Sequence, residues 1–504
     1  MAEAHRKLSF VQRAFRPKPD DLGRSVAQGA ALTFLGIGIR TAITFGSMAV
    51  LARLLTPADF GHVAMATVVT ELAALFANFG FGAILIQRLR ISRIQIDTMF
   101  WSACVLGILL TLAVLVTSLF AGKLFNDPVV GELLQVMGVM FILEELTVVP
   151  RSLLTRMLMF RQDMVVQIGM MLIRAGAGIF LAWSGWGVWS LAMASLAGST
   201  AQMLAYTFVT GYRPRLRFSR SFLANTWRTN GGYFGNGFLF YANANLDLFL
   251  IGRLLGAGAL GYYQNARALT DEIRARIAIP LQQVLFPAFS ALQHDMDRFR
   301  AGILRSGRLL SLAVVPIGFG IGAVADELVP LLYGDQWLEM IPILKIISVG
   351  AGLRAATTIG IPIFNATNRL GLSFRLYLAN TIICLGAIVV GSLWGLTGAA
   401  YAVLFGTGVA LVFFRISIGL VGMDTRDLGR ILGAPTVASV LMFVAVAMVR
   451  VPGLAVTDSI ALQMAILVTV GVAAYVVSIL LIAPAYVGDL RDMLTKFASR
   501  QKAA

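Results

Sequence analysis

The segments ARLLTPADFG (residues 52–61) and GRLLGAGALG (residues 252–261) align without a gap at an offset of 200 residues. The Arg, both Leu and the final Gly are identical, and the register continues to the acids Glu71 and Asp271. The turn around Gly185 and Gly187 corresponds, at nearly the same offset, to the turn around Gly395 and Gly398. Paired repeats of this kind predict a duplicated transporter fold.

Composition places this repeat in a membrane. The 504 residues are 58% hydrophobic and 13% charged, against about 25% charged in soluble domains. A mean hydropathy of +0.81 excludes a soluble enzyme. Cys104 and Cys384 lie in separate apolar runs, which makes a disulfide framework implausible.

Fourteen apolar segments reach the roughly 20 residues that a membrane-spanning helix needs. We therefore predict an all-α, polytopic membrane protein: two six-helix lobes related by a parallel repeat, followed by two further helices. The predicted spans are 27–51, 60–86, 98–121, 129–149, 165–183, 186–210, 231–252, 260–289, 303–325, 341–363, 372–392, 396–420, 430–449 and 460–482.

The basic residues indicate the orientation of these spans. If the N-terminus is cytoplasmic, thirty Lys and Arg residues fall in the two termini, in the inner loops and at the adjoining inner ends of the spans, and five in the outer loops or at the outer ends. Cytoplasmic loops of membrane proteins carry this excess, so both termini are predicted to be cytoplasmic. The net charge of +16 is thereby explained by topology, and a nucleic-acid partner is not expected.

The domain organisation follows from the repeat. We predict a basic cytoplasmic N-terminus, an N-lobe of helices 1–6, a C-lobe of helices 7–12, helices 13–14 and a cytoplasmic tail. Residues 5–16 resemble the basic region of a signal peptide but lack a following cleavage site, so we expect a retained interfacial segment. The five boundaries are 1–24, 25–212, 213–422, 423–484 and 485–504.

Isolated arginines within the spans are the best candidates for a binding site. A charge at mid-bilayer costs about 2.5–3.5 kcal/mol on insertion scales, so it needs a partner, water or a function. Arg40, Arg174 and Arg354 have no acid three or four residues away. We predict that they line a cavity between the lobes and bind an anionic headgroup, because the guanidinium fork suits phosphate. The alternative is an interhelical salt bridge.

A second polar group lies in the eighth span, where Arg267, Asp271 and Arg274 share one helical face. Two interpretations stand equally here. The face is a cavity lining that binds the headgroup, or it holds intrahelical ion pairs, Arg267 with Asp271 and Glu272 with Arg276, that neutralise each other. Glu71, Asp247 and Asp271 are candidate cavity acids, for coupling to a proton or sodium gradient or for pairing with an arginine. No cofactor or metal is expected, because the chain has three His and no GxGxxG, P-loop or HExxH motif.

Four runs resemble a known family. VLARLLTPADFG (50–61), RSLLTRMLMFRQD (151–163), LDLFLIGRLLGAGALGYYQNA (246–266) and VLFPAFSALQHD (284–295) resemble the Wzx-type polysaccharide flippases, colanic-acid exporter-like branch. These belong to the multidrug/oligosaccharidyl-lipid/polysaccharide exporter superfamily. The likeness covers the first eight spans strongly and the remainder mainly by helix count and spacing.

The resemblance implies a non-enzymatic flippase in the bacterial inner membrane. Its substrate would be an undecaprenyl-diphosphate-linked oligosaccharide, moved to the outer leaflet for exopolysaccharide, capsule or O-antigen assembly. Membrane lipids, and a polymerase and chain-length regulator of the same pathway, would be its partners. Related lipid II flippases use cavity arginines, and their two extra C-terminal helices form a groove for the lipid tail.

Three alternatives remain open at this stage. A multidrug or cation antiporter of the same superfamily would have an acid-rich cavity and normally twelve helices. A membrane polysaccharide polymerase or glycosyltransferase would need large outer loops, whereas the longest here spans residues 326–340. The third alternative is a scaffold that transports nothing.

Overall fold

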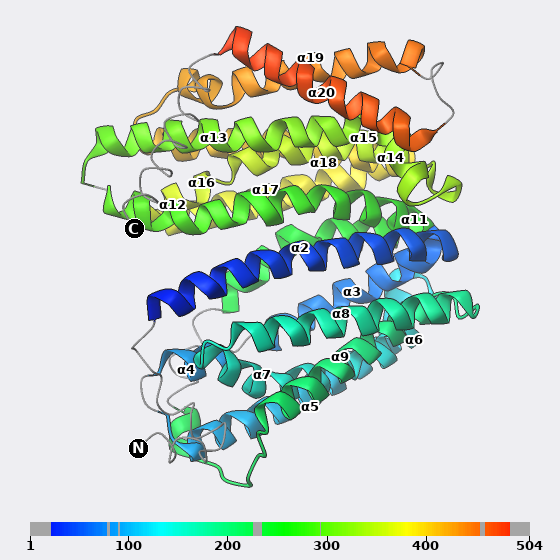
Figure 1. The fold of residues 1–504 in the computed structure, drawn as a ribbon, viewed down its shortest axis with the longest axis vertical. Helices are drawn as coiled ribbons and strands as arrows, with labels where there is room; N and C mark the ends of the chain where they lie inside the picture. Colours follow the sequence, from blue (N-terminus) through cyan, green and yellow to red (C-terminus); the bar gives the residue numbers. More distant parts are fainter. Residues whose placement is uncertain are drawn as a thin grey trace. The chain divides into compact units, whose positions relative to one another are not determined.

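The computed structural model describes residues 22–77, 81–88, 91–224, 234–292, 294–453 and 459–483. Within these ranges the chain is almost entirely helical and contains no strand (Figure 1). It divides into two compact units, Met1–Ala257 and Gly258–Ala504, which we describe separately. The predicted N-terminal segment 5–16 and the tail 485–504 lie outside the described residues.

The first unit is built from helices that run side by side (Figure 1). Helix α8 packs against α2 and α9, and α7 packs against α5 and α9. The helices are α2 (Leu22–Leu54), α3 (Pro57–Ala77), α4 (Phe81–Gln87), α5 (Arg93–Phe125), α6 (Pro128–Gly138), α7 (Met140–Arg156), α8 (Phe160–Trp183), α9 (Trp189–Thr210) and the first part of α11 (Phe234–Ile273).

The predicted repeat marks a helix break in both of its copies. Helix α2 ends before Thr56 and α3 begins at Pro57, whose fixed φ suits the first helical position. Asp59 Oδ2 accepts hydrogen bonds from the Thr56 amide at 2.9 Å and the Thr56 hydroxyl at 2.7 Å. At the position 200 residues later, α11 is broken by Gly256, with φ of +84°. Glycine adopts this conformation without the steric cost of a Cβ.

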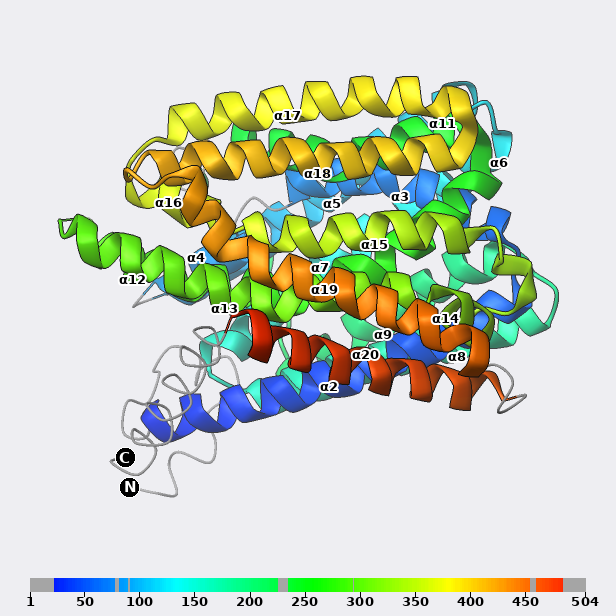
Figure 2. The same ribbon diagram turned by 90° about the horizontal axis from the view of Figure 1, so that it is seen from above.

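The second unit is assembled from the rest of α11 and the helices that follow. Figure 2 shows α17 beside α18, and α19 beside α20, in agreement with their contacts. The elements are the π-helix η3 (Arg274–Ala278), α12 (Ile279–Ala291), α13 (Met296–Ala323), α14 (Ala325–Leu332), η4 (Asp335–Trp337), α15 (Met340–Thr357), α16 (Gly360–Ala366), α17 (Leu370–Gly391), η5 (Ser392–Trp394), α18 (Gly395–Gly419), α19 (Thr425–Gly453) and α20 (Ile460–Ile482).

Small residues bring the helices of the second unit close together. A Cβ on Gly318 of α13 would lie 2.5 Å from the Ser348 carbonyl oxygen and 2.7 Å from the Gly352 Cα, both on α15. A Cβ on Gly398 would lie 2.1 Å from the Gly391 carbonyl oxygen at the α17–α18 turn. Such backbone contacts are typical of helix packing in membranes, where dispersion and small residues replace the hydrophobic effect.

The membrane prediction is confirmed. All fourteen predicted segments coincide with helical structure, some as pairs of short helices such as α6 and α7. Eleven helical stretches among the described residues are long and apolar enough to cross a membrane. Large apolar side chains are also exposed on their surfaces, including Leu119 (70% exposed), Phe208 (88%) and Leu481 (79%). Lipid is the solvent that such a surface requires, since soluble proteins rarely expose large contiguous apolar patches.

The segment after α9 is fixed to the first turns of α5. Tyr212 donates to Asp97 Oδ1 at 2.8 Å, Arg93 donates to the Arg213 carbonyl at 2.7 Å, and the Trp101 indole donates to the Arg215 carbonyl at 2.9 Å. Burial, together with the bond to Asp97, raises the pKa of Tyr212 above its ordinary value. The phenol therefore remains protonated and keeps this anchor.

Candidate functional site

A polar network in the first unit connects four helices around Asp163 of α8. Gln167, one turn further along α8, donates to Asp163 Oδ2 at 2.5 Å, and Tyr206 of α9 donates to Oδ1 at 2.5 Å. The Arg151 guanidinium of α7 lies 3.8 Å from the same carboxylate. Arg40 of α2 completes the network by donating to Gln167 Oε1. One of the predicted arginines thus joins α2 to α8.

Arg174 lies on the same face of α8. Positions 163, 167 and 174 are separated by four and seven residues, which place them in line on a helix of 3.6 residues per turn. The stem of Arg174 packs on Gly198 of α9, where a Cβ would lie 3.0 Å from the Arg174 Cβ. The guanidinium interacts electrostatically with Glu144 of α7. The arginine nevertheless presents exposed surface, so it is accessible to an anion.

Both arginines of the first unit therefore meet groups on other helices. Arg40 donates to the neutral amide of Gln167, so this contact does not compensate the charge of the guanidinium. Arg174 instead interacts electrostatically with the acid Glu144. The electrostatic interaction of Arg174 with Glu144 leaves both interpretations of this arginine open, and its role in binding a headgroup stays a prediction.

The predicted acids of the first unit lie elsewhere. Glu71 is exposed on α3 and acts electrostatically on Tyr241 of α11, whose hydroxyl donates to the Val68 carbonyl. Asp247 is half-buried on α11. Their part in ion coupling stays a prediction.

In the second unit the predicted charges are mostly paired. Arg267 Nε lies 3.2 Å from Asp271 Oδ2, and Arg276 pairs with Glu272, so both intrahelical ion pairs expected by the neutralising interpretation form. Arg354 is exposed near the end of α15. Arg274 lies in the π-helix η3, and its side chain is outside the described residues.

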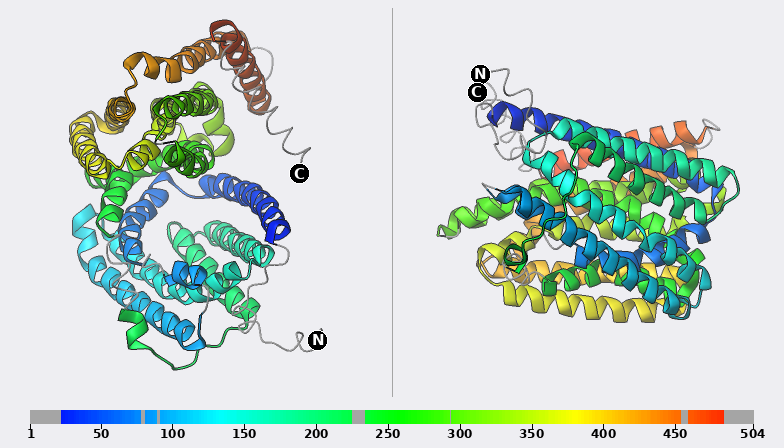
Figure 3. Two further views of the ribbon diagram at one scale, coloured as in Figure 1. Left: turned by 90° about the vertical axis from the view of Figure 1, so that its left-hand side faces the viewer. Right: turned by 90° about the horizontal axis from the view of Figure 1, so that it is seen from below.

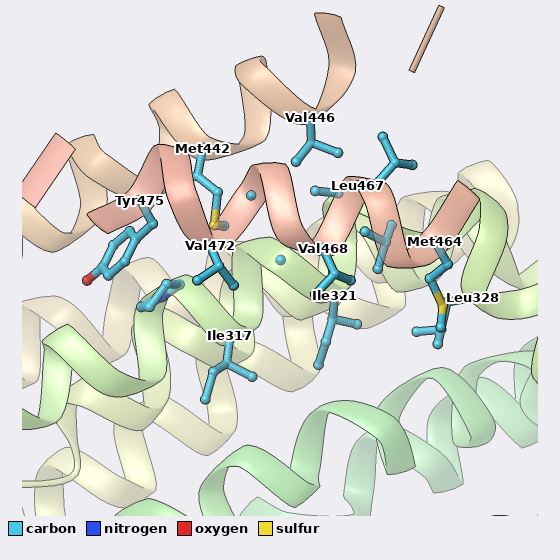
Figure 4. Close-up of a pocket in the computed structure, with 15 residues that line it drawn as sticks. Ile317, Ile321, Leu328, Met442, Val446, Met464, Leu467, Val468, Val472 and Tyr475 are labelled. Atoms are coloured by element: carbon cyan, nitrogen blue, oxygen red, sulfur yellow. The ribbon is translucent and has the colours of Figure 1, made fainter. Parts of the chain in front are cut away.

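The second unit also contains an apolar cavity of about 430 Å³ between α13, α19 and α20. Figure 4 shows Ile317 and Ile321 on one side of it, with Met442 and Val446 opposite. The lining along α20 extends from Met464 to Tyr475, about 16 Å at 1.5 Å per residue. The Tyr475 hydroxyl is satisfied by the Leu312 carbonyl at 2.9 Å, so this end adds no free donor.

Charged groups close the other end of this cavity. Arg450 of α19 donates to both Glu327 carboxylate oxygens at 2.9 Å and to the Ala323 carbonyl at 2.6 Å. Asp326 accepts from Arg450 and, at 2.8 Å, from Lys345. Ala323 at the end of α13, Val324, and Leu328 of α14 also line the cavity, so the cluster fixes α19 at the cavity end.

Comparison with known proteins identifies the family. The sequence pattern of a family described as "Polysaccharide biosynthesis protein" matches residues 50–342, more than half of the chain. The chain belongs to this polysaccharide biosynthesis protein family. The resemblance predicted from the four sequence runs is thereby confirmed.

Two curated proteins are similar to this chain over most of their length. The lipopolysaccharide biosynthesis protein WzxC of Escherichia coli (strain K12) is 28% identical over 372 residues, 72% of this chain and 73% of that protein. The succinoglycan biosynthesis transport protein ExoT of Rhizobium meliloti (strain 1021) is 25% identical over 70% of this chain and 72% of its own.

Solved structures establish the fold of this family member. The lipid II flippase MurJ, in an inward closed conformation, superposes with a TM-score of 0.71 at 13% identity, covering 90% of this chain and 98% of that one. An inward-facing multidrug resistance MATE family transporter gives a TM-score of 0.59 at 18% identity and covers 76% of this chain. The predicted all-α membrane fold is confirmed, and the lipid II flippase structure covers more of this chain than the MATE family structure does, 90% against 76%.

Sequence reasoning missed one feature of the site and anticipated another only through the family resemblance. Asp163 lies eleven residues before Arg174, so a search three and four residues away did not find the acid on its helical face. An apolar groove at the two C-terminal helices was implied by the resemblance to lipid II flippases, but no residue signal placed it, because Val, Leu and Met are equally common on a lipid-facing surface. Only the packing of α19 on α13 and α20 shows which apolar residues line the cavity and which face lipid.

Proposed function

We propose that this protein is a flippase that moves undecaprenyl-diphosphate-linked oligosaccharide repeat units from the inner to the outer leaflet of the bacterial inner membrane. The observation that carries the proposal is the similarity to WzxC and ExoT over about 70% of the chain, since both are named for polysaccharide biosynthesis and one for transport. The protein is thus a transporter and not an enzyme, and the repeat units serve exopolysaccharide, capsule or O-antigen assembly.

Two parts of the structure support this substrate. Exposed guanidinium groups such as Arg174 suit a diphosphate, which accepts several charge-assisted hydrogen bonds. The cavity along α20 suits a prenyl chain, because an apolar lining favours branched hydrocarbon over water. A small cationic drug would need neither feature.

The mechanism proposed is alternating access. The sugar and diphosphate would enter an arginine-lined cavity. The prenyl tail would stay outside that cavity, in lipid and in the apolar cavity along α20, and a change between two conformations would expose the headgroup outward. The predicted cavity residues keep their roles in this proposal: Arg40, Arg174, Arg267, Arg274 and Arg354 for the headgroup, and Glu71, Asp247 and Asp271 for ion coupling.

The topology and partners are part of the proposal. Both termini would be cytoplasmic, as the distribution of Lys and Arg predicts. A polymerase and a chain-length regulator would consume the product. A proton or sodium gradient, the membrane potential or this consumption would drive transport.

The experiment is to deplete the protein in cells and measure diphosphate-linked oligosaccharide lipids by mass spectrometry, with a membrane-impermeant periodate probe of the outer face. Intact repeat units should accumulate and be protected from periodate. Intermediates that reach the outer face unpolymerised would favour a polymerase instead, and unchanged lipids would contradict both.

A further inference from the structure

Glu145 of α7 is a buried acid that the proposed transport cycle has not used. Its side chain is 2% exposed, and Oε2 has no hydrogen-bond partner within the part of the chain that the structure describes. It packs on Gly107 of α5, where a Cβ would lie 3.0 Å from the Glu145 Cβ and 3.2 Å from its Cγ. The space that the absent glycine side chain leaves is therefore filled by this acid.

The position of Gly107 gives the depth of the acid. Helix α5 runs from Arg93 to Phe125, so Gly107 is 14 residues from one end and 18 from the other. At 1.5 Å per residue these are about 21 Å and 27 Å, which places Glu145 near the middle of the span. A carboxylate at this depth, without a donor, is strongly disfavoured relative to the neutral acid.

The charged surroundings favour the neutral acid as well. Glu144, the preceding residue, acts on Glu145 with the same sign of charge, and its own electrostatic partner is Arg174. From α5 the titratable neighbour is Cys104, a free thiol. Helix α4 has no ionisable residue. On other helices that contact α7, Tyr206 of α9 donates to Asp163, Glu71 of α3 acts on Tyr241, and Glu132 of α6 is exposed at the surface.

We propose that Glu145 holds an exchangeable proton in the interior of the first unit, and that release and rebinding of this proton couple a proton gradient to transport. With the proton on Glu145, the group Glu144, Arg174 and Glu145 has no net charge. When the proton leaves to water, the group carries one negative charge, and the new carboxylate can be satisfied only by entering water or by movement of Arg174 away from Glu144. Deprotonation therefore disfavours the closed packing of α7 on α5.

The transport half of this proposal rests on the proposed flippase function, whereas the protonation does not. The proposal also assigns the coupling proton to Glu145 instead of the predicted acids Glu71, Asp247 and Asp271. Arg174 then connects proton release from Glu145 with binding of the headgroup, because a diphosphate that binds this guanidinium competes with Glu144 for it.

Infrared difference spectroscopy on the purified full-length protein tests the protonation. The wild-type protein should show, at neutral pH, the carbonyl stretch of a protonated carboxylic acid, with the shift in D₂O that an exchangeable proton produces. Glu145→Gln should remove this band, while Glu132→Gln, at an exposed acid on α6, should retain it. Glu145→Met, of similar length, gives the same test if the Gln variant folds poorly. A wild-type spectrum without the band, or a band that survives both Glu145 variants, would overturn the proposal.

Proteoliposomes test the coupling. With undecaprenyl-diphosphate oligosaccharide as substrate, an imposed pH gradient should raise the initial flipping rate of the wild-type protein several-fold. The same gradient should leave the flipping rate of Glu145→Gln unchanged, although this variant should still exchange substrate between leaflets at equal pH. Equal responses to the gradient in both proteins would overturn the coupling and leave the flippase function standing. Absence of any flipping by wild type would overturn the proposed function, while the infrared result would still decide whether Glu145 is protonated.

Discussion

At the scale of single residues, Arg40 and Arg174 show how helix geometry converts isolated charges into a connected site. Each was identified from the sequence because its own helix offers no acid one turn away. In the structure Arg40 donates to Gln167 of another helix, and Arg174 interacts electrostatically with Glu144 of a third. The arginines could therefore be predicted, but their partners could not, because tertiary packing alone brings α2, α7 and α8 together.

Arg174→Ala should lower the initial rate of substrate flipping about tenfold or more, since losing a hydrogen bond to a charged group costs about 1.5–3 kcal/mol and each 1.4 kcal/mol is a factor of ten. The measurement is flipping in proteoliposomes at equal protein content. Arg161→Ala, an exposed arginine at the start of the same helix, is the matched control and should retain the wild-type rate. Full rates for Arg174→Ala and Arg40→Ala alike would refute the cavity assignment.

Gly107→Ala should destabilise the protein by about 1–3 kcal/mol, because the new methyl group would meet the Phe141 carbonyl oxygen and the Glu145 Cβ, each at 3.0 Å. Gly176→Ala is the control, since nothing lies within 4 Å of its Cβ position on α8 and alanine favours a helix. Thermal unfolding in detergent compares the two. Equal melting temperatures would show that Gly107 is not a packing constraint.

At the scale of secondary-structure elements, the repeat explains why two helix breaks occur where they do. Thr56 and Gly256 are equivalent in the sequence alignment, and the chain leaves helical geometry at both. The first break uses Thr, Pro and Asp as capping residues, whereas the second uses a glycine with positive φ. The right view of Figure 3 shows the long helices along their length. Span positions could be predicted from hydropathy, but the division of spans into α6 and α7 or α15 and α16 could not. The sequence carries no charge across either junction, which reads QVMGVMFIL at 135–143 and AATTIGIPIF at 355–364.

The cavity on α20 gives a test at this scale. Val472→Trp should slow flipping of a long-chain prenyl substrate several-fold, because the indole would fill space that the tail needs. Val477→Trp places the same side chain at a similarly exposed position of α20 that is outside the cavity lining, and should have little effect. If both variants flip the substrate at the wild-type rate, the cavity does not hold the tail.

At the scale of the whole molecule, the distribution of Lys and Arg predicts which helix ends face the cytoplasm. In a background with Cys104 and Cys384 replaced by Ser, Arg88→Cys should lie inside and Lys123→Cys outside. A membrane-impermeant maleimide added to intact cells should label only Lys123→Cys, and both should react after permeabilisation. Labelling of Arg88→Cys in intact cells would reverse the orientation.

The central claim is that this chain alone moves a diphosphate-linked oligosaccharide between leaflets. The most direct measurement reconstitutes the purified full-length protein in liposomes with undecaprenyl-diphosphate oligosaccharide in the inner leaflet and follows its appearance outside with an impermeant periodate probe. Wild type should expose the substrate faster than protein-free liposomes, and Arg174→Ala should be slower by about tenfold. Exposure no faster than in protein-free liposomes would contradict the flippase function.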